Sequence, residues 1–121
     1  MEKLSIQEEE VMQAIWHTGE GPIKAFIELV KEPKPPYTTI ASTVKNLEKK
    51  GFLSSRLLGN TYLYTPVIAE EEYKQKFMQG FVQNYFNNSY KEMVNFFVTQ
   101  KKLKPHELKE IIDMIDHNKT K

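Results

Sequence analysis

The chain has 121 residues, 40% of them hydrophobic and 27% charged, with a formal net charge of +1. This length fits one domain, or a small domain with an appendage, and the balanced charge gives no global argument for a nucleic-acid partner. Because the chain has no cysteine, disulfides, thiolate metal sites and cysteine nucleophiles are excluded.

The charge is unevenly distributed along the chain. In residues 1–20 five glutamates outnumber one lysine, and in residues 37–65 four basic side chains outnumber one glutamate. A neutral protein with one basic segment can still carry a basic face. The N-terminus lacks the apolar core of a signal peptide, and no apolar run approaches the ~20 residues of a membrane span. A cytoplasmic protein with no membrane insertion is therefore expected.

Two helices are predicted in the first 30 residues. Ser5 and Glu8 form the S-x-x-E pattern of a capping box, which predicts that the first helix begins here. Apolar residues at helical spacing continue to Thr18, and Gly-Glu-Gly at 19–21 ends the helix. Pro22 suits the start of a second helix, whose apolar stripe is predicted to run to Val30. Prolines between positions 33 and 36 then force an extended connection.

A third helix and a hairpin follow. Over about 38–50, Ile40, Val44 and Leu47 recur at helical spacing and are predicted to face the core, and Gly51 ends the helix. The period then changes to two over 52–58 and 61–65, and the Gly-Asn pair between these runs indicates a two-residue hairpin loop. Three helices followed by a hairpin is the order of a winged helix-turn-helix.

The rest of the chain, from about Ile68, is predicted to be helical again, with starts near Glu70, Ser89 and Pro105. Its broad apolar faces have no intrachain partner large enough to cover them, so self-association is expected. The predicted fold class is mainly α with a small β-hairpin, with a winged-helix domain over 1–67 and a helical dimerisation region over 68–121. The residues predicted to form the dimer contact are Phe77, Phe81, Tyr85, Met93, Phe96, Phe97, Leu108, Ile111, Ile112 and Ile115.

Three stretches together resemble one family. They are LSIQEEEVMQAIW at 4–16, TIASTVKNLEKKGFL at 39–53 and YLYTP at 62–66. They are similar to the motifs of the BlaI/MecI/CopY penicillinase-repressor family of bacterial transcription regulators. The resemblance covers nearly the whole chain. It implies a homodimer that binds double-stranded operator DNA through an N-terminal winged helix, with a C-terminal helical dimerisation region.

The resemblance also implies where DNA is read. The third helix is rich in hydroxyl residues, which are poor helix formers; alone, they would be interpreted as a cap and solvated side chains. In the family context they suit close approach to the major groove, with lysines on the phosphates. The family commonly has Arg where Asn46 stands; Arg reads guanine, whereas Asn favours adenine. The predicted DNA-binding residues are Thr38, Thr39, Ser42, Thr43, Lys45, Asn46, Lys49, Lys50 and Arg56.

Other candidate sites are weaker. Arg56, in the first wing strand, is either a phosphate contact or a solvated strand charge. Asp113 and His117 lie four residues apart, but two ligands do not complete a metal site, and a solvated helix end is favoured. No catalytic residues, metal or cofactor are predicted, and the cysteine cluster with which CopY-type members sense metal is absent.

The C-terminal region holds one further family feature. In β-lactam-responsive members, induction involves proteolysis at an Asn-Phe bond, by or downstream of a membrane sensor protease. Asn95-Phe96 is such a pair here, although alignment on the following residues shifts the bond to Phe96-Phe97. An amphipathic helix packed into the dimer core is the alternative for this segment. For the whole chain, the alternative function is a winged-helix protein-interaction module with a dimerising tail and no DNA target.

Overall fold

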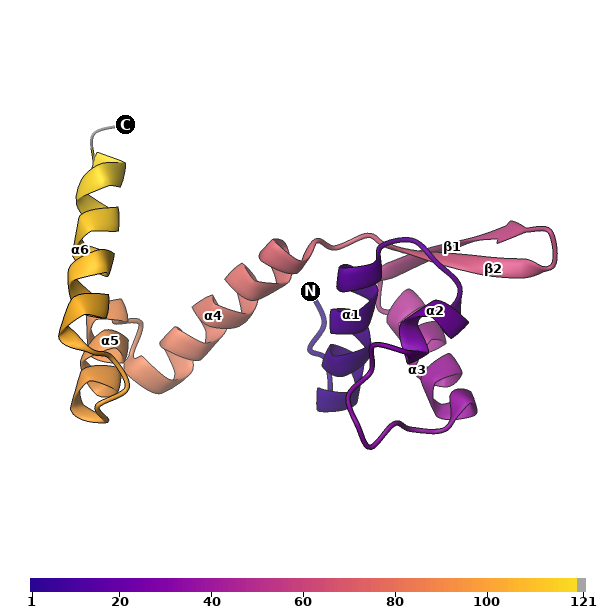
Figure 1. Ribbon diagram of the computed structural model, residues 1–121, viewed down its shortest axis with the longest axis horizontal. Helices are drawn as coiled ribbons and strands as arrows, with labels where there is room; N and C mark the ends of the chain where they lie inside the picture. Colours follow the sequence, from indigo (N-terminus) through magenta and orange to yellow (C-terminus); the bar gives the residue numbers. More distant parts are fainter. Residues whose placement is uncertain (120–121) are drawn as a thin grey trace. The chain divides into compact units, whose positions relative to one another are not determined.

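A computed structural model describes residues 1–119 and confirms the predicted fold class. The elements in chain order are α1 (Ile6–Thr18), α2 (Ile23–Ile27), α3 (Tyr37–Lys49), β1 (Leu53–Leu58), β2 (Thr61–Pro66), α4 (Glu70–Phe86), α5 (Tyr90–Thr99) and α6 (Pro105–Lys119) (Figure 1). The chain forms two compact units that meet within α4: the first ends at Lys76 and the second begins at Phe77.

The predicted ends of α1 and α3 are confirmed. Ser5 Oγ accepts from the Glu8 amide at 3.1 Å, and Glu8 Oε1 accepts from the Ser5 amide at 2.8 Å, which completes the capping box. At the C-terminal end of α3, Gly51 has a φ of +84°, and the Phe52 amide donates to the Leu47 carbonyl at 3.0 Å. This is a Schellman turn, which satisfies the last carbonyls of the helix and delays the first strand to Leu53.

The second helix is shorter than its apolar stripe predicted. It ends at Ile27, and a turn follows in which the Val30 amide donates to the Ile27 carbonyl at 3.3 Å. Val30 is nevertheless buried. The stripe therefore identified a core contact correctly but not the conformation of the backbone that makes it.

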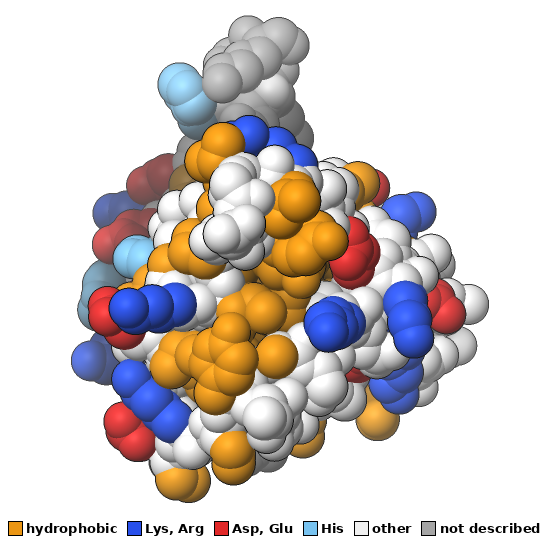
Figure 2. All heavy atoms as spheres, turned by 90° about the vertical axis from the view of Figure 1, so that its right-hand side faces the viewer, with side chains coloured by type: hydrophobic (Ala, Val, Ile, Leu, Met, Phe, Trp, Pro, Cys, Tyr) orange, Lys and Arg blue, Asp and Glu red, His pale blue; other side chains and the backbone are white. Residues whose placement is uncertain are grey.

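The wing is the predicted antiparallel hairpin, in which Leu58 pairs with Thr61 across the Gly-Asn loop. Sequence patterns did not reveal that Gly21, after α1, also pairs with Tyr64 of β2, through hydrogen bonds of 2.8 and 3.1 Å. This bridge ties the base of the wing to the α1–α2 loop. Viewed from the side of the hairpin tip, a band of hydrophobic side chains has Lys and Arg on its flanks (Figure 2).

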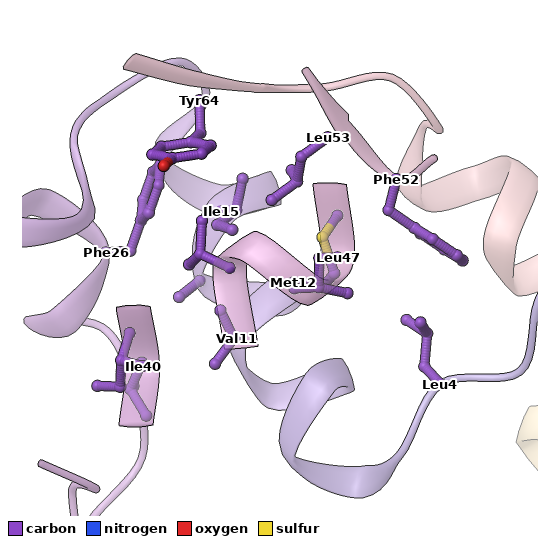
Figure 3. Close-up of a cluster of buried hydrophobic side chains, with 13 residues drawn as sticks. Leu4, Val11, Met12, Ile15, Phe26, Ile40, Leu47, Phe52, Leu53 and Tyr64 are labelled. Carbon is purple, nitrogen blue, oxygen red and sulfur yellow. The ribbon is translucent and has the colours of Figure 1, made fainter. Parts of the chain in front are cut away.

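The first unit has one hydrophobic core. Its side chains come from α1, α2, α3 and the base of the wing, and they converge in one cluster (Figure 3). Fully burying such a side chain contributes about 1.5–3 kcal/mol relative to leaving it exposed. The cluster fixes α3 against α1 and α2, which leaves the opposite face of α3 open. Its members are Leu4, Val11, Met12, Ala14, Ile15, Phe26, Val30, Ile40, Val44, Leu47, Phe52, Leu53 and Tyr64.

The start of α4 belongs to this first unit. The Trp16 indole Nε1 donates to the Ile68 carbonyl at 2.9 Å. The Tyr73 ring lies 5.5 Å from that of Trp16 and 5.8 Å from that of Phe52, and its hydroxyl donates to Glu9. Burial, followed by the hydrogen bond to Glu9, raises the pKa of Tyr73. The segment that follows the wing is thus packed on the winged-helix core up to the second turn of α4.

The second unit exposes most of its apolar surface. In its described part only Val82 is buried, although aromatic rings contact one another from Phe77 to Phe97. As predicted, Ser89 caps α5 by accepting from the Glu92 amide. The exposed large apolar residues are Phe77, Met78, Tyr85, Tyr90, Phe96, Val98, Ile111, Ile112, Met114 and Ile115. Residues 120–121 of the predicted dimerisation region lie outside the described residues. No helix described here is long and apolar enough to span a bilayer.

Candidate nucleic-acid interface

The face of α3 opposite the core carries one stripe of polar and basic side chains. Thr38, Ser42, Lys45 and Lys49 lie at helical spacing on this face and are all exposed. Within the described residues, neither lysine takes part in an ion pair. The stripe therefore presents two short hydroxyl side chains near the start of the helix and two uncompensated positive charges further along. Short side chains allow close approach of a groove, and lysines suit phosphates.

The other two hydroxyl residues of α3 lie differently. The Thr39 carbonyl accepts from Ser42 Oγ at 2.9 Å and from Thr43 Oγ1 at 2.8 Å. Thr43, which the resemblance implied to be a DNA-binding residue, is buried on the core side, and Thr39 is half-buried. Bonding to a carbonyl one turn back is the usual way in which Ser and Thr fit a helix interior. Thr43 thus completes the helix-core packing, and its hydroxyl has a partner inside the helix.

Asn46 and Lys50, near the end of α3, both bind Glu8 of α1. Asn46 Nδ2 donates to Glu8 Oε2 at 2.6 Å, and Lys50 Nζ donates to Glu8 Oε1 at 2.8 Å. Lys50 Nζ also donates to the Lys3 carbonyl at 3.1 Å. Glu8 therefore serves two purposes: it caps its own helix and fastens the end of α3 to the start of α1.

Glu8 as a residue is 6% exposed, and both oxygens of its carboxylate accept hydrogen bonds. Burial alone raises the pKa of this carboxyl, but the hydrogen bonds from Lys50, the Ser5 amide and Asn46 outweigh burial and lower the pKa to about 2. Glu8 is consequently ionised across the physiological range. An ionised carboxylate accepts hydrogen bonds and donates none.

The single arginine of the wing is also paired. Arg56 Nε and Nη2 donate to the two oxygens of Glu20 at 3.1 and 2.8 Å, and Thr65 Oγ1 donates to Glu20 Oε2 at 2.7 Å. The hydrogen bond from Arg56, followed by that from Thr65, lowers the Glu20 pKa to about 2, and the same pairing raises the Arg56 pKa. We refer to these three residues as the wing clasp. The clasp compensates the Arg56 charge, whether or not Arg56 also meets a phosphate.

The outer part of the wing carries an exposed apolar pair to which the sequence motifs assign no role. Leu57 and Tyr62 face each other across the two strands, on the same side of the hairpin as the buried Leu53 and Tyr64, but they are 57% and 56% exposed. The period-two alternation of β1 contained the signal, because positions 53, 55 and 57 must share a face. The hydrophobic core of the first unit ends before β1 does, so this pair lies beyond the core and is exposed.

Comparison with known proteins identifies the family. A sequence model of the family described as "Penicillinase repressor" matches residues 4–117. The chain belongs to the penicillinase repressor family. The resemblance found in the three motifs is thereby confirmed. Members of this family are transcriptional regulators and not enzymes.

Individual relatives of this repressor-family chain agree along nearly its whole length. The penicillinase repressor of Bacillus licheniformis is 28% identical over 120 residues, which cover 98% of this chain and 94% of the relative. The methicillin resistance regulatory protein MecI of Staphylococcus aureus (strain N315) is 25% identical over 117 residues, or 94% of each chain. A solved chain of Bordetella bronchiseptica BpsR, from a study of how 6-hydroxynicotinic acid regulates its DNA binding, covers 98% of this chain and 77% of its own length. Its identity is 13% and its TM-score is 0.49, too low to carry over a function.

Proposed function

We propose that this chain is a homodimeric, sequence-specific DNA-binding repressor, with α3 in the major groove and the wing beside the phosphate backbone. The observation that carries the proposal is the outer stripe of α3, where Thr38 and Ser42 precede Lys45 and Lys49, two lysines without an ion pair in the described part of the chain. Family membership supports the same assignment. We also place the protein in the cytoplasm, where its operator would be.

The proposed interface divides into two kinds of contact. Thr38, Ser42 and Asn46 are exposed and short, so they suit base edges and nearby sugar–phosphate atoms. Lys45 and Lys49 suit phosphates, which set affinity without reading sequence. Thr39 lies at the edge of this face. The burial of Thr43 and the pairing of Lys50 with Glu8 argue against direct DNA contacts by those two side chains.

Binding to duplexes, measured as a function of salt, tests this proposal. The full chain should bind random duplex at low salt and select a pseudo-palindromic site from a random pool, because a dimer presents two winged helices to two half-sites. Lys49→Ala should weaken specific and non-specific binding about equally and flatten the slope of log K against log salt by about 1.8 units, because each of the two protomers loses one phosphate contact worth about 0.9. Lys91→Ala, an exposed charge in α5, is the matched control and should leave the slope unchanged. If the wild type shows no duplex binding at low salt, the DNA-binding proposal fails and the protein-interaction alternative takes its place.

Dimerisation through the second unit is the other half of the proposal. Large apolar residues are exposed on α4, α5 and α6, and monomers in water rarely leave large contiguous apolar patches uncovered. A second copy of the same unit is the economical cover, because a two-fold dimer places identical apolar faces together. The proposed division into a DNA-binding winged helix and a dimerising helical region follows from this. Linking two winged helices would raise affinity for paired half-sites by effective concentration.

We further propose that the repressor is released by proteolysis between Val94 and Val98, within α5. Asn95 and Phe96 are exposed and Phe97 is half-buried. The segment is helical, so a protease needs α5 to open locally before it can cut. A membrane sensor protease is the proposed initiating partner. Mass spectrometry of the repressor from induced cells would find fragments ending in this window. An intact repressor alongside full expression of the target genes would refute release by cleavage.

A further inference from the structure

The contact between Glu8 and Asn46 constrains how the proposed interface reads DNA; this inference rests on the proposed function. We propose that Glu8 is a positioning residue that turns the Asn46 carboxamide so that its oxygen faces the DNA. Asn46 would then select a base with an exocyclic amino group, adenine or cytosine. The contact joins α1 to α3 across 38 positions of sequence.

The geometry holds the Asn46 nitrogen on Glu8. Nδ2 lies 2.6 Å from Glu8 Oε2, while the other Glu8 oxygen is occupied by the Ser5 amide and by Lys50 Nζ, each at 2.8 Å. Glu8 is buried, and its position is set by its own helix cap and by the ion pair. It therefore cannot rotate to meet a different group without breaking the capping box.

The orientation of the amide follows from chemistry as well as from the coordinates. The two ends of an asparagine amide differ only in hydrogen bonding, so the identity of the partner decides which end is which. Glu8 is an ionised acceptor, so the amide oxygen of Asn46 cannot face it without repulsion. Nδ2 must therefore point to Glu8, and Oδ1 must point away from it.

Asn46 is exposed, and among residues 1–119 its Oδ1 accepts no hydrogen bond. An outward acceptor matches the N6 amino group of adenine or the N4 amino group of cytosine, and it opposes the O6 of guanine and the O4 of thymine. The charge of Lys50 balances that of Glu8. A buried carboxylate so close to the proposed interface is therefore not left as an uncompensated charge facing phosphates.

Glu8→Gln makes a sharp test because it should invert the preference. The introduced glutamine can keep its oxygen on the Ser5 amide and Lys50, which places its NH₂ group where Glu8 Oε2 stood. Asn46 must then flip to accept from that NH₂ group, and its own NH₂ group would face the DNA. The preferred base at that position should change from adenine or cytosine to guanine or thymine, whose major-groove oxygens accept.

The experiment selects duplexes from a random pool with the full-length wild type, Glu8→Gln, Asn46→Ala and the double variant. At one position of each half-site, the preference for adenine or cytosine should fall about tenfold in Asn46→Ala and should invert in Glu8→Gln. The double variant should show the same preference as Asn46→Ala. Glu10→Gln makes the same chemical change on the same helix, at a carboxylate without a hydrogen bond in the described chain, and should select like the wild type. An unchanged preference in Glu8→Gln, or an additive double variant, would overturn the positioning role.

A second measurement changes the DNA and leaves Glu8 in place. In the site selected by the wild type, the contacted adenine or cytosine is replaced by purine or 2-pyrimidinone, which lack the amino group. Affinity should fall about tenfold for the wild type and stay level for Asn46→Ala. If no position of the half-site behaves in this way, the inference is wrong even though DNA binding stands. If the wild type selects no sequence at all, it is the proposed function that has failed.

Discussion

Lowering the pH should remove the stabilisation that Glu8 contributes, and comparison with Glu8→Gln isolates it. The folded pKa of Glu8 is about 2, against an ordinary value of 4.5. Because the folded pKa is lowered, the stabilisation is fully present above about pH 4.5 and is lost as the pH falls toward 2. A shift of this size corresponds to about 3 kcal/mol as an upper estimate, since one pKa unit is about 1.4 kcal/mol. Solvent screens this carboxylate little, because its side chain is 7% exposed.

Urea unfolding followed by tryptophan fluorescence measures this contribution. Trp16 is the only tryptophan, and it lies in α1 beside Tyr73, so its emission reports the first unit. Wild type and Glu8→Gln should differ by about 2–3 kcal/mol in unfolding free energy at pH 6, and the difference should shrink to near zero at pH 2. All other titrating groups are common to both chains and cancel. Protein concentration is held fixed, because a dimer's stability depends on it.

The ionised Glu8 carboxylate makes no such contribution if the difference in unfolding free energy stays constant from pH 6 to pH 2. That result would mean that Glu8→Gln acts through packing and not through charge. Glu10→Gln supplies the baseline and should show no pH-dependent difference of this size from the wild type.

Further substitutions and one truncation test the two units separately. Ile112→Glu should convert the dimer to monomer in sedimentation at micromolar concentration, whereas Ile6→Glu, at an exposed isoleucine of α1, should leave it dimeric. Gly51→Ala should destabilise the chain by about 1 kcal/mol in urea unfolding, because the φ there is +84°. Gly80→Ala, inside α4 and with open space around it, should instead stabilise it by about 0.5–1 kcal/mol. A chain ending at Lys76 should fold, stay monomeric and bind DNA more weakly than the full protein, and a dimeric fragment would contradict the assignment of the interface.

Local patterns predicted most of the elements well because those elements have strong local causes; α2, which ends before its apolar stripe does, is the exception. The end of α3 is an example. The core-facing period runs to Leu47, and Gly51 supplies the left-handed residue that a Schellman turn requires. The hairpin is another, since Gly59 and Asn60 fix both the loop and the register. At such places the neighbouring residues in the sequence determine the conformation of the backbone.

Contacts between distant segments could not be predicted in the same way. The pairing of Gly21 with Tyr64 is an isolated bridge of one residue from each segment. It therefore produces no periodic pattern in the sequence. Glu8 was correctly interpreted as half of a capping box, but a cap uses only one carboxylate oxygen. The second oxygen binds Asn46, and only the core packing of α1 against α3 brings these residues together.

The placement of Thr43, by contrast, could have been predicted. At 100° per residue, position 43 falls beside Ile40, Val44 and Leu47, which were already assigned to the core. Grouping the hydroxyl residues of α3 by chemistry instead of by angle put Thr43 among the predicted DNA-binding residues. The structure separates them: Thr38 and Ser42 are exposed, while Thr43 is buried.

The acidic segment at residues 1–20 and the basic segment at residues 37–65 contact each other in the fold. These contacts reduce the positive charge that the proposed interface offers to DNA. Glu8 compensates Lys50, and Glu20 compensates Arg56. Among the basic side chains predicted to meet DNA, Lys45 and Lys49 are left unpaired in the described chain. A dimer then neutralises about four phosphates, so log K should fall with log salt at a slope of about −3.6. Glu20→Gln removes the charge that the wing clasp sets against Arg56, and two further contacts should steepen the slope to about −5.4. If Glu20→Gln leaves the wild-type slope unchanged, Arg56 does not contact DNA, and the clasp serves only to hold the wing against the α1–α2 loop.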